Sequence, residues 1–165
     1  MIKGIWTGAA AAAAVVVLSS PVFAQQTDTR TVSVNATVNA RAKLTLGSAA
    51  ITFADADPDV TPTLSATPFS VDVKARTTAA GSVSLTVSAP NLISGSDSIA
   101  VSNLQWTASG TGFTTPGTMS TSAVTAGSWT GSGNQSGTHT YTLTNSWAYN
   151  TGSYTTTITY TLTAP

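Results

Sequence analysis

The stretch that decides the fold is TVSVNATVNARAKLTL, residues 31–46, in which apolar and polar residues alternate without a break. Such a period of two is typical of a β-strand with one buried face and one solvated face. At roughly 3.3 Å per residue the stretch would span about 50 Å, whereas ordinary strands reach about 20 Å. The sequence therefore predicts a strand that bends and serves two sheets, or one that partly leaves its own domain and completes another subunit.

The rest of the chain repeats this alternation in shorter segments. Residues 69–76, 83–87, 138–144 and 154–164 alternate clearly, residues 51–53 suggest a short strand, and residues 79–81 resemble a hairpin connection. Turn-forming Gly, Pro, Asn and Asp residues separate them, and residues 55–68 read as a loop. The pattern predicts an all-β fold, an antiparallel β-sandwich of about eight or nine strands, immunoglobulin- or pilin-like, with almost no helix.

The first 24 residues have the features of a secretory signal peptide. Lys3 supplies the positive start, an apolar run covers residues 9–18, and the small residue Ala24 ends the cleavage region. The run is too short to span a bilayer, which needs about 20 residues. We therefore predict a signal peptide (1–24), a flexible lead-in (25–30) and one β-sandwich domain (31–165). The protein would be secreted, periplasmic or on the cell surface, with no transmembrane anchor after cleavage.

The composition of the chain excludes several classes of function. The chain has six Lys or Arg residues, six acidic residues and no Cys. The balance of charge gives no basic footprint for nucleic acid, and the absence of Cys excludes disulfides and thiolate metal sites. Arg41 and Lys43 lie on the polar side of the long alternating stretch, where charges commonly guard a sheet edge against random pairing; a basic partner surface is the alternative.

Two secreted bacterial groups resemble the ends of this chain. The opening strand, the short ITF at residues 51–53 and the closing GSYTTTITYTLTAP resemble spore-coat-U and fimbrial (pilin-like) subunits, although Ala42 stands where that family usually has a Cys. The resemblance implies an exported sandwich that assembles by donor-strand exchange, in which one subunit's N-terminal strand fills a neighbour's sheet. The closing strand and Leu104-Gln105-Trp106 also resemble, more weakly, WxL-type cell-wall-binding domains.

Asp55, Asp57 and Asp59 are spaced by two in ADADPDV. Carboxylates at this spacing are candidate calcium ligands, because calcium takes six to eight oxygens. The loop is not an EF-hand, since Val60 stands where the loop needs Gly and Ala66 where it needs Glu. The alternative is a solvated turn, which Asp and Pro both favour. We expect no metal and no cofactor.

Four aromatic residues are candidates for a sugar-binding platform or for the core. Trp106 shares its parity with Leu104 and is expected in the core, whereas Trp129 and Trp147 lie in Gly-, Ser- and Asn-rich surroundings and are expected to be more exposed. With Tyr149 they are the glycan candidates, because aromatic faces stack on flat apolar surfaces. Packing over one end of the sandwich is the alternative.

The residue inventory argues against an enzyme. His139 is the only histidine, no G-x-S-x-G sequence accompanies it, and neither Glu nor Cys follows the predicted signal. We predict no catalytic residues, and we expect His139 to be an exposed strand residue.

Two hypotheses for the function remain. The first is a non-enzymatic structural subunit of a pilus or coat, whose N-terminal strand pairs at a sheet edge in its own subunit or in the next. In the exchanged case, the residues that fill the groove of the second copy are Val32, Val34, Ala36 and Val38. The second is a module that binds cell-wall glycan through Trp129, Trp147 and Tyr149.

Overall fold

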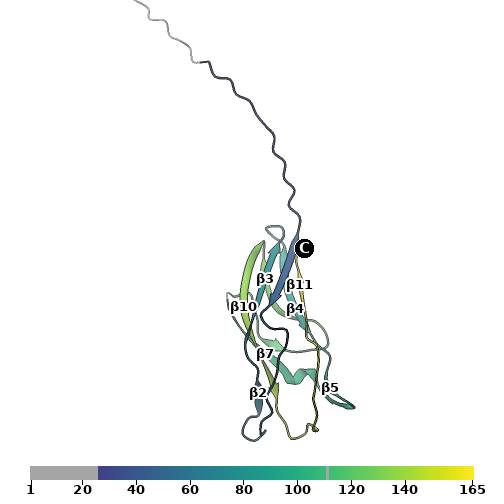
Figure 1. Cartoon of the computed structure of the whole chain (residues 1–165). Coiled ribbons are helices and arrows are strands. Elements are labelled where there is room, and N and C mark those ends of the chain that lie inside the picture. Colours follow the sequence, from purple (N-terminus) through teal and green to yellow (C-terminus); the bar gives the residue numbers. More distant parts are fainter. Residues whose placement is uncertain (1–25, 111) are drawn as a thin grey trace, which may run out of the picture. The chain divides into compact units, whose positions relative to one another are not determined.

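The computed structural model describes residues 26–110 and 112–165, so the predicted signal peptide lies outside the described residues. Residues 37–165 form one compact unit, and the described residues 26–36 fall outside it. The described chain contains strands β1 to β11 and a single 3₁₀ turn, with no α-helix (Figure 1). The predicted all-β class is therefore confirmed.

The largest sheet has the strand order β1-β3-β10-β7-β8, and β2 pairs with the far end of β10. Every pairing in it is antiparallel. Its strands are β1 (Arg41–Leu46), β2 (Thr63–Ser65), β3 (Phe69–Arg76), β7 (Leu104–Gly110), β8 (Gly117–Thr118) and β10 (Gly133–Thr144).

The second sheet has the antiparallel order β11-β4-β9. Its strands are β11 (Thr159–Thr163), β4 (Ser82–Ser88) and β9 (Val124–Thr130). A small hairpin, β5 (Leu92–Ser94) with β6 (Asp97–Ile99), leads into the 3₁₀ turn Val101–Asn103, where the sequence pattern changes parity.

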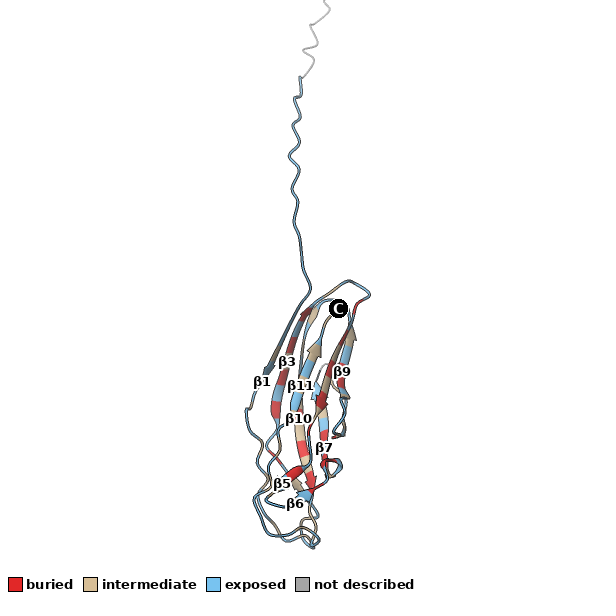
Figure 2. Cartoon of the chain, turned by 90° about the vertical axis from the view of Figure 1, so that its right-hand side faces the viewer, coloured by how far each residue is buried: buried red, intermediate tan, exposed pale blue. Residues whose placement is uncertain are grey.

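The core lies between the two sheets because the alternation places one apolar face of each strand inward. Val71 and Val73 of β3 pack in one cluster with Leu85 and Val87 of β4, and all four are at most 1% exposed. Figure 2 shows the same alternation as red bands along the strands. Burying each such side chain stabilises the fold by about 1.5–3 kcal/mol, and the arrangement is consistent with a β-sandwich.

Trp106 belongs to the same core cluster, as predicted. It is 1% exposed, and its indole N–H donates to the backbone oxygen of Thr115 at 2.8 Å. Its ring rests on Gly117, where an added Cβ would lie 2.5 Å from two ring atoms. A buried indole thus keeps its hydrogen bond and is closely packed.

Three local predictions are wrong. Residues 79–81 do not form a hairpin, because β3 and β4 belong to different sheets and the connection crosses between them. Residues 51–53 form no strand, and β2 instead lies inside the predicted loop 55–68. In each case the choice of partner strand, which is non-local, overrides the local pattern.

Candidate functional site

The long alternating stretch divides into two parts. Only its last six residues form a strand, β1, whereas residues 26–40 lie outside any helix or strand. Val32, Val34 and Val38 are 87%, 88% and 67% exposed. The predicted strand that bends and serves two sheets is therefore wrong, because no described strand offers residues 31–40 a ladder of hydrogen bonds. The other alternative, that this part leaves its own domain and completes another subunit, stays a prediction.

The two sheets are incompletely covered along one side. β1 and β11 are edge strands of their sheets, and their inward-facing Leu44, Leu46, Tyr160 and Leu162 are only half-buried. By contrast, Leu85 on the neighbouring β4 is fully buried. Apolar side chains that face inward yet remain half-exposed mark a place where the core lacks a covering element.

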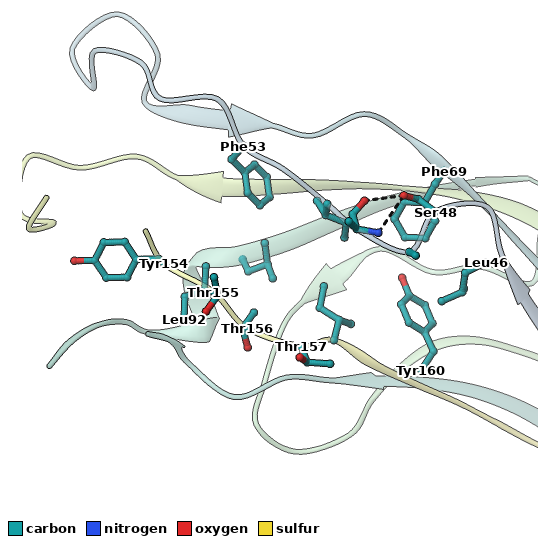
Figure 3. Close-up of a pocket in the computed structure, with 15 residues that line it drawn as sticks. Leu46, Ser48, Phe53, Phe69, Leu92, Tyr154, Thr155, Thr156, Thr157 and Tyr160 are labelled. Atoms are coloured by element: carbon teal, nitrogen blue, oxygen red, sulfur yellow. Dashed lines mark hydrogen bonds between the residues drawn. The ribbon is translucent and has the colours of Figure 1, made fainter. Parts of the chain in front are cut away.

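A groove of about 340 Å³ lies at this open side. One wall is formed by residues 46–53 and the other by residues 154–160, with Phe69, Leu92 and Leu104 between them. Figure 3 shows Leu46 and Tyr160 at one end of the groove and Phe53 and Tyr154 at the other. Most of the lining is apolar, so water in the groove gains few hydrogen bonds.

The backbone along both walls has unused hydrogen-bonding groups. Within residues 26–110 and 112–165, neither residues 52–54 nor residues 156–157 bond to another backbone group, although Thr155 next to them pairs with Ile93. Ser48 satisfies Ala50 locally: its hydroxyl donates to the Ala50 carbonyl at 2.7 Å and accepts from the Ala50 N–H at 3.3 Å (Figure 3). Free N–H and C=O groups beside an apolar groove suit an added extended segment.

A buried polar network lies directly behind the groove. The Tyr160 hydroxyl is 2.9 Å from Nδ1 of His139 and 2.8 Å from the hydroxyl of Tyr141. His139 is 0% exposed, which corrects the prediction that it faces solvent. The burial of His139 could have been predicted from the sequence, because on β10 it lies on the same side as Tyr141 and Leu143, between threonines that face outward.

Burial shifts the acid–base properties of this network. It lowers the pKa of His139 from 6.5 to about 4, and it raises the pKa of Tyr141 to about 12 and that of Tyr160 as well. The imidazole is therefore neutral at pH 7, and its Nε2 has no partner among the described residues. The three hydrogen-bonded side chains are one imidazole and two phenols, so this network is not a Ser-His-Asp triad.

Two of the three candidate calcium ligands, Asp57 and Asp59, accept hydrogen bonds from the protein. Asp57 Oδ1 accepts the backbone N–H of Asp59 at 2.9 Å, and Asp59 Oδ1 accepts the indole N–H of Trp147 at 3.1 Å. In the described part of the chain no three acidic or histidine side chains gather as a metal site would require. The hydrogen bond from the Asp59 N–H to Asp57 is typical of a turn that begins at an Asp residue.

The glycan candidates do not form one platform. Trp147 is 70% exposed, as expected, but Trp129 is half-buried and packs edge-on against Phe113 at 5.7 Å between ring centroids. Trp129 precedes the start of β10 and Trp147 follows its end. The first and last of the 12 residues of β10 are eleven steps of about 3.3 Å apart, or roughly 35 Å. Tyr149 lies in the same loop as Trp147 but is half-buried against the core.

No protein-family model matches the chain, and no curated protein matches it significantly. Among the residues that the structure describes, no helix is both long enough and apolar enough to cross a membrane.

Proposed function

We propose that this protein is a secreted, non-enzymatic structural subunit that assembles by donating its N-terminal segment to a second copy. In this assembly residues 31–40 of one copy lie as a strand in the groove of the next. The observation that carries the proposal is a sandwich with one uncovered apolar side in a chain that also has an exposed, alternating apolar segment. The resemblance to fimbrial subunits points the same way.

The chemistry of donor and acceptor matches. Val32, Val34, Ala36 and Val38 are two residues apart, so in an extended conformation all four point to one side, toward an apolar groove. Burying the three valines contributes about 2 kcal/mol each before the entropy of ordering is subtracted. Backbone pairing with residues 52–54 or 156–157 would satisfy groups that are otherwise free.

A pair of variants one residue apart tests the proposal. Val34→Asp places a charge on the apolar side of the segment, whereas Asn35→Asp places the same charge on its polar side. We expect the purified exported chain to form linear oligomers in electron micrographs and in size-exclusion chromatography. Val34→Asp should abolish them and Asn35→Asp should retain them.

A deletion of residues 25–40 provides the second arm. The truncated chain should remain a folded monomer, and a synthetic peptide of residues 26–40 should bind to it. Oligomers that survive both the deletion and Val34→Asp would reject strand donation.

The second candidate function is glycan binding at a single aromatic residue. It is favoured by one observation, the exposed Trp147 indole whose N–H is fixed by Asp59. Trp147→Ala should then abolish the retention of the protein on insoluble peptidoglycan, while Trp129→Phe should leave it unchanged. Retention indifferent to Trp147→Ala would exclude this function.

A further inference from the structure

The charges of the domain are separated between its two ends. The basic face consists of Arg41, Lys43, Lys74 and Arg76, which are four of the six Lys and Arg residues of the chain. The acidic end consists of Asp55, Asp57, Asp59 and Asp97, which are four of the six acidic residues. From this separation, and on the basis of the proposed strand donation, we propose that the basic face of one copy contacts the acidic end of the next and so sets the direction of assembly.

The basic face is built from like charges placed opposite each other. In the β1–β3 ladder Arg41 is paired with Arg76 and Lys43 with Lys74, and all four side chains are exposed. Directly opposed like charges destabilise a sheet. The ion pair seen in the described residues is Arg30–Asp28, so none of the four makes an ion pair within the described domain. Asp72, two residues from Lys74 on β3, is the one carboxylate of β3 beside them. Four cations with one neighbouring carboxylate leave an excess of positive charge that suits an external anion.

The acidic end borders the mouth of the groove. Phe53 lines the groove and Asp55 follows two residues later, while on the other wall Tyr154 donates to Asn150, whose amide donates to Asp97 at 2.9 Å. The basic face lies at the opposite end of β10, because Gly133 pairs with Ala75 and Thr144 pairs with Thr63. The two ends are thus about 35 Å apart, far beyond the screening length of about 8 Å at physiological salt. They attract another copy rather than each other.

Charge distinguishes the two directions in which a donated segment can lie. The segment joins its own domain at Arg41, so its C-terminal end carries the basic face with it. If the segment runs antiparallel to β11, this end lies where β11 begins, beside the acidic end. If it runs parallel to β11, the basic faces of the two copies meet and repel. Every strand pairing between the described strands is antiparallel, which favours the same choice for a segment that pairs with residues 156–157.

Zero-length carbodiimide cross-linking of the full exported chain tests the contact directly. Isotope-labelled and unlabelled copies are mixed, so that only cross-links between copies join the two labels. We expect amide links from Lys43 or Lys74 to Asp55, Asp57 or Asp59 of the other copy. Because the two ends are far apart within one chain, such links cannot form internally. Their absence would overturn the proposal, whether or not oligomers form.

Charge reversal tests whether the contact between the basic face and the acidic end affects the rate of assembly. Lys43→Glu with Lys74→Glu, or Asp55→Lys with Asp57→Lys, should slow assembly at low salt by about tenfold, and the combined four-residue swap should restore it. Thr107→Glu with Thr125→Glu, on exposed positions elsewhere, should have little effect.

Assembly that depends on Val34 but is unchanged by these charge reversals would leave strand donation intact and refute the charge contact. If reversal abolishes binding to phosphatidylglycerol vesicles instead, without slowing assembly, the basic face serves a lipid surface and the proposal is wrong.

Discussion

The hydroxyl of Tyr160, on an edge strand beside the groove, lies 2.9 Å from Nδ1 of the fully buried His139. Tyr141 completes the network at 2.8 Å from the same hydroxyl. The network therefore joins the last strand to the centre of the larger sheet. Protonation of a group in this network should therefore change how strongly β11 is attached to the larger sheet.

Acid should weaken the fold through His139. Its pKa is about 4 when folded and about 6.5 when unfolded, so between these values the unfolded chain binds a proton that the folded chain does not. The stability from the neutral imidazole is present above pH 6.5 and is lost as the pH falls toward 4, by at most about 3 kcal/mol. Urea denaturation across this range should measure the loss, and His139→Phe should remove it. Parallel pH profiles for the two proteins would contradict the assignment.

Gly117→Ala should destabilise the core around Trp106. The new Cβ would lie 2.5 Å from the buried ring, and the ring cannot shift without losing its hydrogen bond to Thr115. We expect a loss of about 1–3 kcal/mol in the free energy of unfolding. Gly133→Ala is the control, because its Cβ would meet its nearest neighbour at 3.8 Å. Equal effects of the two substitutions would show that the indole is free to move.

Ala50→Trp should block the groove without unfolding the domain. Ala50 lines the groove and is exposed, so a large side chain there can fill the space that a donated strand would occupy. The variant should lose the binding of a peptide of residues 26–40, measured by calorimetry, while its melting temperature stays unchanged. Ala80→Trp, at an exposed position in the connection between β3 and β4, should bind the peptide normally.

Asp59→Ala should release the Trp147 side chain. Its indole N–H would lose the acceptor at 3.1 Å, while the exposed loop would lose little else. We expect lower fluorescence anisotropy and stronger acrylamide quenching, with a stability change of under about 0.5 kcal/mol. Trp147→Phe is the control, since it should remove the readily quenched signal that the exposed indole supplies. Unchanged quenching in Asp59→Ala would mean that the hydrogen bond does not fix the ring.

Local patterns were enough to predict the fold class and part of the core. The alternating pattern directly predicts that Val71, Val73 and Leu85 face the core. Trp106 is predicted to do the same because it lies two residues from Leu104. The end of the first strand could not be predicted in this way. Val34 and Leu44 occupy equivalent positions in the pattern, yet only Leu44 has a neighbouring strand to bond with.

The candidate site was predictable only in part. The sequence indicates that residues 31–40 have an apolar side, but the groove depends on two edges from opposite ends of the chain lying near each other. Pairing of β1 with β3 and of β11 with β4 is a non-local outcome. The facing Arg41–Arg76 pair likewise appears only when the register is known.

The pairing of β4 with β11 also sets when the protein can finish folding. Ser88 meets Thr159, so the smaller sheet joins two strands that lie far apart in the sequence. A chain of which β11 has not yet left the ribosome has no means of closing that sheet. Folding must therefore wait for β11 to emerge, at the slow pace of topologies dominated by distant contacts, and the unfinished intermediate is the species that quality-control proteases and chaperones would meet.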